Sequence, residues 1–360
     1  MQQLSRLVLK GYKSIKNLDI ELNQLNVFIG PNGAGKSNFI SFFNLLNAIV
    51  NQQLGVFVPK NGFADSFLHY GRQSTEAIRA QLQFGPDGYQ FTLEPTANNR
   101  FIFTDETLTS QKEGHQPVKS LGAGHDESKL QKCYNENNDI AKHLMPIIKS
   151  WPVYHFHDTS RTAKVKQIGS IHDHAYFRTD ASNLAAFLYK LKLKHKKQYQ
   201  AICMTVQKVA PFFGDFVLEP ALEDRSSIEL KWREKGGDFP FTAHHLSDGT
   251  LRLIALATVL LQPEPPASII IDEPELGLHP FAINILGGLI RSLSKSNQII
   301  LSTQSVSLLD QFQANDVIVT EKINDVSKFN RLKDEDLEKW LEEYSLSELW
   351  EKNYLKGRPS

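Results

Sequence analysis

The residues with the most distinctive chemistry form a glycine-rich stretch, GPNGAGKS, at residues 30–37. It matches the G-x-x-x-x-G-K-[ST] pattern of a phosphate-binding loop, and it lies between the strand-like segment LNVFIG and the apolar helical segment at residues 36–50. Gly33 and Gly35 let the backbone curl around phosphate groups at conformations that a Cβ would obstruct. The pattern therefore predicts a nucleotide site, against the alternative of a chance glycine-rich turn.

Two side chains of this loop can serve phosphoryl transfer. Lys36 is expected to bridge the β- and γ-phosphates of ATP, and the Ser37 hydroxyl is expected to bind Mg²⁺. The cofactors predicted here are therefore ATP and Mg²⁺. The residues expected to contact the nucleotide are Gly30, Pro31, Asn32, Gly33, Ala34, Gly35, Lys36, Ser37 and Asn38.

A pair of carboxylates follows the fully apolar segment at residues 267–271, which suits a central parallel strand. At the carboxyl end of such a strand, Asp272 is expected to hold Mg²⁺. Glu273 is expected to polarise the water that attacks the γ-phosphate. The pair by itself would also fit a plain helix cap. Together with the phosphate loop it predicts a catalytic centre.

The sequence LSDGTLR at residues 246–252 precedes an apolar helix, and Ser247 is a natural N-cap for that helix. The free N–H groups and the dipole of a helix N-terminus favour an anion. Ser247 and Gly249 are therefore candidate phosphate-contacting residues. The alternative is a serine that only caps an ordinary buried helix.

The order of GPNGAGKSN, LSDGTLR, IDEPELGLHP and STQS along the chain resembles the ABC-type P-loop ATPases, in particular SMC and RecF heads and the predicted ATPases called AAA-21 or OLD-like. The resemblance spans almost the whole chain. It implies an α/β fold in which the ATPase head has a mixed, mainly parallel central sheet, an antiparallel β-lobe and a helical insertion. It also implies a homodimer in which the signature loop of one copy caps the γ-phosphate held by the other.

Gln304 departs from the pattern of the family, whereas His279 departs from that of the transporters and is shared with the OLD-like and RecF-like branch. Gln304 stands where the family's switch has a histidine that senses the γ-phosphate, and glutamine cannot carry charge or relay a proton. We assign Gln304 to the catalytic group but expect slow hydrolysis, and the alternative function is a nucleotide-dependent scaffold. His279 stands where transporters have an aspartate, which disfavours transport. A P-loop kinase would leave LSDGTLR unexplained.

The resemblance implies two further nucleotide contacts. Lys13, in GYKSIKN at residues 11–17, matches an early basic residue that approaches the nucleotide in SMC and RecF heads. Asp158, in HFHDTSR at residues 155–161, lies where the family has the loop that couples Mg²⁺ to the inserted lobe. The alternative for this second segment is that its two histidines are structural.

The pattern of strands and helices predicts how the chain is organised. Alternating apolar residues predict a β-hairpin with its turn near Gly11, antiparallel strands between Ala77 and Leu108, and a mobile loop at 110–127. The expected parts are an N-terminal ATPase lobe at 1–110, a mainly helical insertion at 111–211, a C-terminal ATPase lobe at 212–330 and an amphipathic tail at 331–360.

Composition limits the partners. Forty basic residues balance forty acidic ones, so contact with nucleic acid requires a local patch, for which Lys190–Lys197 is the densest basic run. Such a run is also typical of a solvated helix face. No apolar stretch is long enough for a membrane span, and we expect a cytoplasmic protein without zinc or disulfides. The resemblance implies a role in phage defence or DNA repair, with any Toprim-type nuclease a separate partner.

Overall fold

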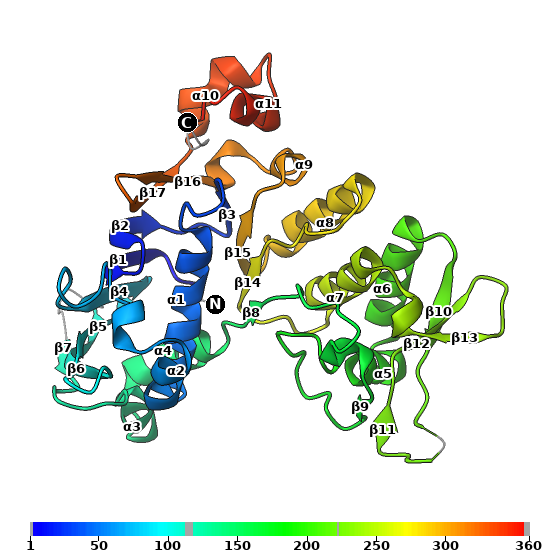
Figure 1. The fold of residues 1–360 in the computed structure, drawn as a ribbon, viewed down its shortest axis with the longest axis horizontal. Helices are drawn as coiled ribbons and strands as arrows, with labels where there is room; N and C mark the ends of the chain where they lie inside the picture. The colour runs from blue at the N-terminus through cyan, green and yellow to red at the C-terminus, as the bar shows by residue number, and fades with distance from the viewer. Residues whose placement is uncertain (1–2, 112–117, 222, 356–360) are drawn as a thin grey trace.

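The computed structural model describes residues 3–111, 118–221 and 223–355. Two six-stranded sheets dominate the fold, and helix α1 (Lys36–Val50) packs in one hydrophobic cluster with residues of both sheets. Figure 1 shows the antiparallel lobe in blue and cyan and the second lobe in green and yellow, on opposite sides of the central strands. The strand-loop-helix unit predicted around the phosphate loop is therefore the middle layer of the molecule.

The first sheet is antiparallel, as the alternating pattern predicts, and its strand order is β2-β1-β4-β5-β6-β7. The predicted β-hairpin is confirmed, but β1 runs on to Tyr12, so the chain reverses at Lys13 and Ser14, slightly beyond Gly11. In the segment predicted as a loop, residues 118–120 form β7, and residues 112–117 lie outside the described part. The strands are β1 (Arg6–Tyr12), β2 (Ile15–Glu21), β4 (Ile78–Phe84), β5 (Asp87–Pro95), β6 (Phe101–Ser110) and β7 (Val118–Ser120).

The central sheet has the order β17-β16-β3-β15-β14-β8 and is parallel except for its edge strand β17. Its inner strands β3, β14 and β15 are buried at every position because helices and the first sheet cover both faces. Neighbouring strands β3, β15 and β14 end at the same edge. The strands are β3 (Leu25–Ile29), β8 (Val153–Tyr154), β14 (Ser268–Asp272), β15 (Gln298–Thr303), β16 (Val317–Ile323) and β17 (Val326–Arg331).

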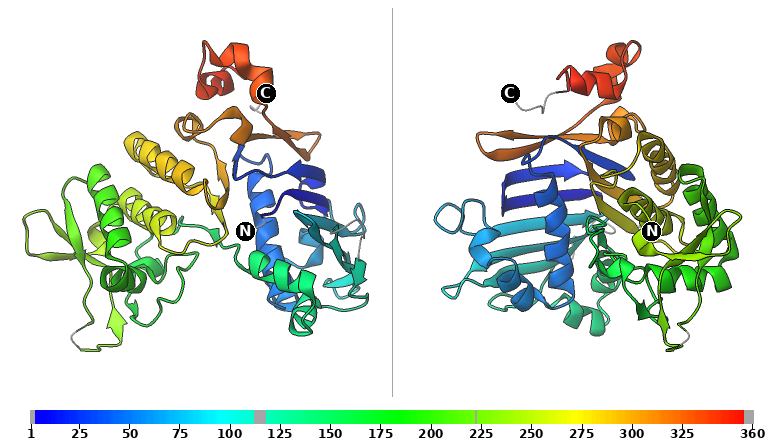
Figure 2. Two further views of the ribbon diagram at one scale, coloured as in Figure 1. Left: turned by 180° about the vertical axis from the view of Figure 1, so that it is seen from behind. Right: turned by 45° about the vertical axis from the view of Figure 1, so that its right-hand side comes forward.

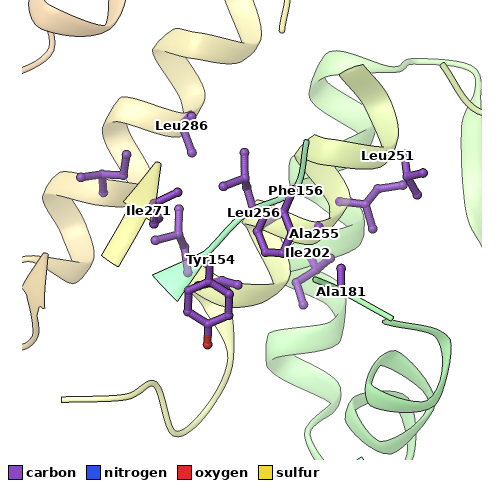
Figure 3. Close-up of a cluster of buried hydrophobic side chains, with 14 of the residues drawn as sticks. Tyr154, Phe156, Ala181, Ile202, Leu251, Ala255, Leu256, Ile271 and Leu286 are labelled. Carbon is purple, nitrogen blue, oxygen red and sulfur yellow. The ribbon is translucent and has the colours of Figure 1, made fainter. Parts of the chain in front are cut away.

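The second face of this sheet is covered by α5 (Leu184–Lys194), α6 (Lys196–Val209), α7 (Asp248–Leu261) and α8 (Pro280–Leu293). Figure 3 shows α7 in this core: Leu251, Ala255 and Leu256 of the helix lie among side chains from the central sheet and the neighbouring helices. Burying each leucine side chain contributes roughly 1.5–3 kcal/mol. The helix that follows LSDG is therefore held firmly against the sheet.

The stretch between residues 128 and 211 is less helical than predicted. Helices α3 (Leu130–Asn135) and α4 (Asp139–Lys149) pack with the antiparallel sheet, whereas α5 and α6 belong to the other lobe. Between them, residues 150–183 hold only short elements, including β8 and the two-residue strand β9 (Gly169–Ser170). The reason is that this segment crosses from one lobe to the other and adds a strand to the central sheet on the way.

The remaining elements are small. Four short strands follow residue 212, namely β10 (Phe213–Val217), β11 (Ser227–Ile228), β12 (Lys231–Glu234) and β13 (Pro240–Thr242). The shorter helices are α2 (Leu54–Lys60), α9 (Val306–Leu309), α10 (Asp334–Leu341) and α11 (Leu346–Glu351). The two views in Figure 2 show α10 and α11 together beyond the edge strand β17.

The tail packs onto the domain. Leu346, Leu349 and Trp350 are buried in the same cluster as the second face of the central sheet, whereas Trp340 is 41% exposed. The amphipathic pattern of the tail is therefore explained mainly by packing. None of the helices in the described part of the chain has the length and apolar character needed to span a membrane.

Candidate nucleotide site

The phosphate loop joins β3 to α1 at the common edge of the central strands. Gly33 and Gly35 both have positive φ, 78° and 115°, as the motif predicts. A Cβ on Gly35 would also lie 2.0 Å from the hydroxyl oxygen of Ser327. Asn32 at the tip of the loop is exposed. Position 35 is therefore restricted to glycine by its backbone conformation and by the close approach of β17.

Two distant segments hold the loop in place. The Ser327 hydroxyl donates to the carbonyl oxygen of Ala34 (2.6 Å) and also contacts the Ser14 hydroxyl (2.7 Å). The side-chain amide of Asn38 donates to the same Ser14 oxygen (2.7 Å). Ser14 comes from the β1–β2 turn and Ser327 from β17. Ser14 lies in the segment GYKSIKN but was not singled out there, and Ser327 lies outside every motif, so sequence reasoning missed both.

Lys36 faces the loop and the acidic strand end together. Its ammonium group donates to the Gly30 carbonyl oxygen (2.5 Å). Burial lowers the pKa of Lys36. The carboxylates of Asp272, Glu273 and Glu275 act on this pKa in the opposite direction. The predicted catalytic lysine and the predicted carboxylates therefore share one electrostatic environment.

The side chains of β15 orient the two predicted carboxylates. The buried Ser302 hydroxyl donates to the Asp272 carboxylate across the β14–β15 pair. Glu273 has a left-handed backbone (φ 46°), a sparsely populated conformation for a non-glycine residue, and its N–H donates to the Ser302 carbonyl oxygen (3.0 Å). The Gln304 side-chain amide donates to Glu273 Oε1. The structure thus brings Gln304 to the predicted catalytic base.

The residues predicted to hold magnesium suit that ion. Ser37 is exposed at the start of α1, and Asp272 presents a carboxylate at the neighbouring strand end. Hydroxyl and carboxylate oxygens are the ligands that Mg²⁺ prefers, and the ion usually completes its shell with water and substrate phosphates. In the described ranges no group of three or more His, Cys, Asp or Glu side chains is placed to bind a metal. A site that shares its ion with the nucleotide needs no such group.

The segment predicted to contain Asp158 contributes different residues to the site. His157 Nε2 lies 3.1 Å from the Asp272 carbonyl oxygen, and His155 Nδ1 lies 3.8 Å from the Asp272 carboxylate. Burial lowers the pKa of His155, which favours the neutral ring. Asp158 itself is exposed and accepts a hydrogen bond from the Ser160 N–H (3.1 Å). The structure therefore brings the two histidines to the acidic edge rather than Asp158.

Lys13 lies beside α1. Its ammonium group donates to the hydroxyl of Ser41 (3.0 Å), one helical turn beyond Ser37, and the rings of Tyr12 and Phe67 lie near it at 5.6 and 5.5 Å. Burial lowers the pKa of Lys13. Contact with a nucleotide stays a prediction for this residue.

The start of α7 is confirmed as a serine-capped helix. The Ser247 hydroxyl accepts a hydrogen bond from the Thr250 N–H (3.2 Å), and Ser247 is exposed. A Cβ on Gly249 would lie 2.4 Å from the carbonyl oxygen of Gly277, so the helix tip touches the loop that follows Glu273. The tip is thus placed next to the acidic edge but faces outward.

Arg252 ties this tip to its surroundings. Its guanidinium group donates to the carbonyl oxygens of Phe156 (3.0 Å), His157 (3.0 Å) and Leu276 (2.9 Å). One side chain thus connects α7 with the segment after β8 and the segment after β14. The motif LSDGTLR contains this arginine, but its partners are visible only in the structure.

Comparison with known proteins agrees with this geometry. The sequence model of the AAA_21 family, described as "AAA domain, putative AbiEii toxin, Type IV TA system", matches residues 25–117 and 123–310. "Putative ABC transporter ATP-binding protein MG303" of Mycoplasma genitalium is 25% identical over 177 residues, 45% of this chain and 48% of the relative. The "OLD nuclease" of Thermus scotoductus is 22% identical over 336 residues, 85% of this chain and 60% of the relative. The chain therefore spans about half to three fifths of these curated relatives.

The fold is also similar to that of a solved structure. A head domain of an Smc protein, crystallised with the C-terminal winged-helix domain of ScpA, superposes with a TM-score of 0.62 at 17% identity. The superposition covers 93% of this chain and 99% of the other. At this identity the likeness shows the fold alone.

Proposed function

This chain belongs to the AAA_21 family of P-loop ATPases of the SMC and OLD-like type, and on that premise we propose that it binds and hydrolyses Mg-ATP between two copies of itself. One observation carries the proposal. The carboxylates of Asp272 and Glu273 act on Lys36 within one chain, whereas Ser247 is exposed and, among the described residues, its hydroxyl bonds to Thr250 of its own helix tip. The chain thus presents a phosphate-binding half and an exposed capping half.

Within one copy, each side chain has a defined task. Lys36 and the N–H groups of the loop bind the phosphates, and Ser37 with Asp272 would hold Mg²⁺, which neutralises charge on the β- and γ-phosphates when bound. Glu273 accepts a proton from the attacking water. The hydrogen bond from Gln304 fixes the orientation of the Glu273 carboxylate.

The surface around Ser247 supports a second copy as the capping partner. Leu276 and Phe281, on either side of His279, are 43% and 52% exposed. Exposed large apolar side chains next to a polar site are typical of an interface. The Ser247 tip of one copy would therefore meet the γ-phosphate on the phosphate loop of the other.

The test is the oligomeric state of Glu273→Gln with saturating Mg-ATP, measured by light scattering after size exclusion. This variant keeps the shape of Glu273 but cannot accept a proton, so ATP should persist and dimers should accumulate. Lys36→Ala with Mg-ATP and the unmodified chain with Mg-ADP are the controls and should stay monomeric. A Glu273→Gln variant that binds ATP yet stays monomeric would contradict the proposal.

A nucleotide-dependent scaffold is the second candidate, and Gln304 favours it. A glutamine amide orients Glu273 but cannot relay a proton as histidine can. Phosphate release followed over hours separates the two functions. Turnover that Glu273→Gln abolishes supports the ATPase, whereas ATP-dependent dimers without turnover in the unmodified chain support the scaffold.

The proposed biological role is control of a partner that acts on nucleic acid, in phage defence or DNA repair, with a separately encoded Toprim-type nuclease as the candidate effector. The similarity to an OLD nuclease supports this role.

Within Lys190–Lys197, Lys192 pairs with Asp215 (3.4 Å), while Lys194, Lys196 and Lys197 are exposed. Changing these three exposed lysines to glutamate should weaken binding to duplex DNA and reduce its salt dependence, measured by fluorescence anisotropy.

A further inference from the structure

Glu275 connects the two loops that carry the predicted base and the switch. Its Oε1 accepts hydrogen bonds from the Thr303 hydroxyl (2.7 Å) and from the N–H groups of Gln304 (2.9 Å) and Ser305 (3.2 Å). The donors all lie at the end of β15, whereas Glu275 follows β14. One carboxylate oxygen therefore holds the Thr303 side chain and the backbone of Gln304 and Ser305 at the point where β15 ends.

This backbone is the base from which the Gln304 side chain extends. The Gln304 amide donates to Glu273 Oε1, so Glu275 is linked to Glu273 through the loop between them. Glu273 has a left-handed backbone and lies two residues before Glu275 in the same turn. Gln304 is thus hydrogen-bonded to both Glu275 and Glu273, and the short chain segment from Glu273 to Glu275 closes a ring at the edge of the sheet.

The buried position of Glu275 would destabilise the folded chain if the carboxyl group served only for packing. Its Oε2 is buried and has no hydrogen-bond partner among the described residues. Burial raises the pKa of Glu275, against the hydrogen bonds from residues 303 and 304. An unpaired buried polar atom destabilises the folded chain, and an apolar side chain would avoid this cost. The carboxyl group is therefore better explained by the loop that it holds than by packing.

We propose that Glu275 is a positioning residue for ATP hydrolysis, which holds residues 303–305 so that the Gln304 amide binds one oxygen of Glu273 and leaves the other for the attacking water. In that reaction the water oxygen bonds to the γ-phosphorus, the bond from this phosphorus to the bridging oxygen of ADP breaks, and Glu273 takes the proton. The inference rests on the proposed ATPase function and adds a residue to it.

The test is a double-mutant cycle in the full chain. Glu275→Ala and Gln304→Ala are made singly and together, and kcat, KM, the ATP dissociation constant and the thermal unfolding midpoint are measured for each. Because a misplaced base costs up to about 100-fold in rate, Glu275→Ala should lower kcat roughly 10–100-fold. KM and the dissociation constant should change less than about threefold, since the phosphate loop is untouched.

Two comparisons show whether Glu275 acts by positioning Glu273 through Gln304 or only by stabilising the fold. Glu275→Gln keeps an oxygen that accepts the same hydrogen bonds, so it should retain at least about a third of the wild-type kcat. In the Gln304→Ala background, Glu275→Ala should lower kcat less than about threefold further, because both changes break the same path. If Glu275→Ala does not fold, Thr303→Val tests the same path by removing one donor, and it should lower kcat with KM unchanged.

The outcomes distinguish this inference from the function on which it rests. If the unmodified chain turns over ATP, the inference is overturned when Glu275→Ala keeps the full kcat. It is also overturned when the loss of kcat in the double variant equals the product of the two single losses. Either outcome leaves the ATPase proposal intact. Parallel losses of kcat and ATP affinity that Glu275→Gln does not rescue also overturn it. No turnover in the unmodified chain overturns both.

Discussion

The phosphate loop and the tip of α7 differ in how the chain holds them. The loop is bound by Ser14 and Ser327, which lie 313 residues apart, and Lys36 is buried against its carbonyl oxygens. The tip of α7 is exposed, and the Ser247 hydroxyl caps the helix by bonding to Thr250 of the same helix. The body of α7, in contrast, is buried in the core of the second lobe.

This difference indicates that the phosphate loop and the tip of α7 have separate functions. A loop held from two sides needs little rearrangement to bind phosphates, because the entropic cost of ordering it is met when the chain folds. A rigid helix with an exposed N-terminus is suited to bind an anion brought by another molecule. The comparison therefore predicts that changes in the loop affect ATP binding, whereas changes at the tip affect dimerisation.

The largest expected effect is the loss of ATP affinity on changing the phosphate loop. Lys36→Ala should weaken ATP binding by at least about 100-fold, roughly 3 kcal/mol, because it removes a charge that the loop presents to the phosphates. Fluorescence titration with a nucleotide analogue measures this change. Lys60→Ala, which removes an exposed lysine at the end of α2, is the control and should bind normally. Equal affinity in the two variants would contradict the assignment.

Gly35→Ala tests the fit of the loop against β17. The positive φ and the contact with Ser327 should together lower the free energy of unfolding by about 2 kcal/mol. Gly236→Ala is a matched control, because Gly236 also has positive φ but open space around it, so its loss should be about 1 kcal/mol. Urea unfolding compares the two. A smaller loss for Gly35→Ala than for Gly236→Ala would show that β17 does not constrain the loop.

Ser247→Ala tests the tip. In the Glu273→Gln background it should weaken the ATP-dependent dimer about tenfold, roughly 1.4 kcal/mol, while ATP binding to the monomer stays within about twofold. Ser345→Ala removes the same kind of cap from α11 and should leave the dimer unchanged. Analytical ultracentrifugation measures both dissociation constants. If the two serine variants behave alike, the tip of α7 does not cap the nucleotide.

The smallest expected effect is on pH dependence. Glu275 has a raised pKa in the folded chain, so its neutral form favours folding, and this contribution is lost as pH rises from 4.5 through the raised value. The nearby charges are Glu273, which raises this pKa, and Lys36. Glu275→Gln cannot ionise, so its stability relative to the unmodified chain should increase over this pH range. Urea unfolding at several pH values measures it, and parallel curves would contradict the prediction.

The local motifs were predictable because their chemistry is local. The phosphate loop, the pair Asp272 and Glu273, and the serine cap of α7 each occupy a few consecutive residues whose types and spacing determine the backbone. The strand and helix around the phosphate loop follow from apolar periodicity, and the structure confirms both. The resemblance to SMC and OLD-like proteins, which rests on the same motifs, is confirmed by the family to which the chain belongs.

The contacts around those motifs were not predictable in the same way. Ser327 lies outside every motif, and although Arg252 and Glu275 lie within LSDGTLR and IDEPELGLHP, the spacing of those motifs does not identify the partners of these two residues. The sequence also pointed to Asp158, whereas the short strand β8 turns His155 and His157 towards Asp272. By itself, then, the sequence determined the phosphate loop with its flanking strand and helix, and it predicted which groups bind phosphate and move a proton. The tertiary structure alone decided how they are oriented, because strand order and register bring together residues that are distant along the chain.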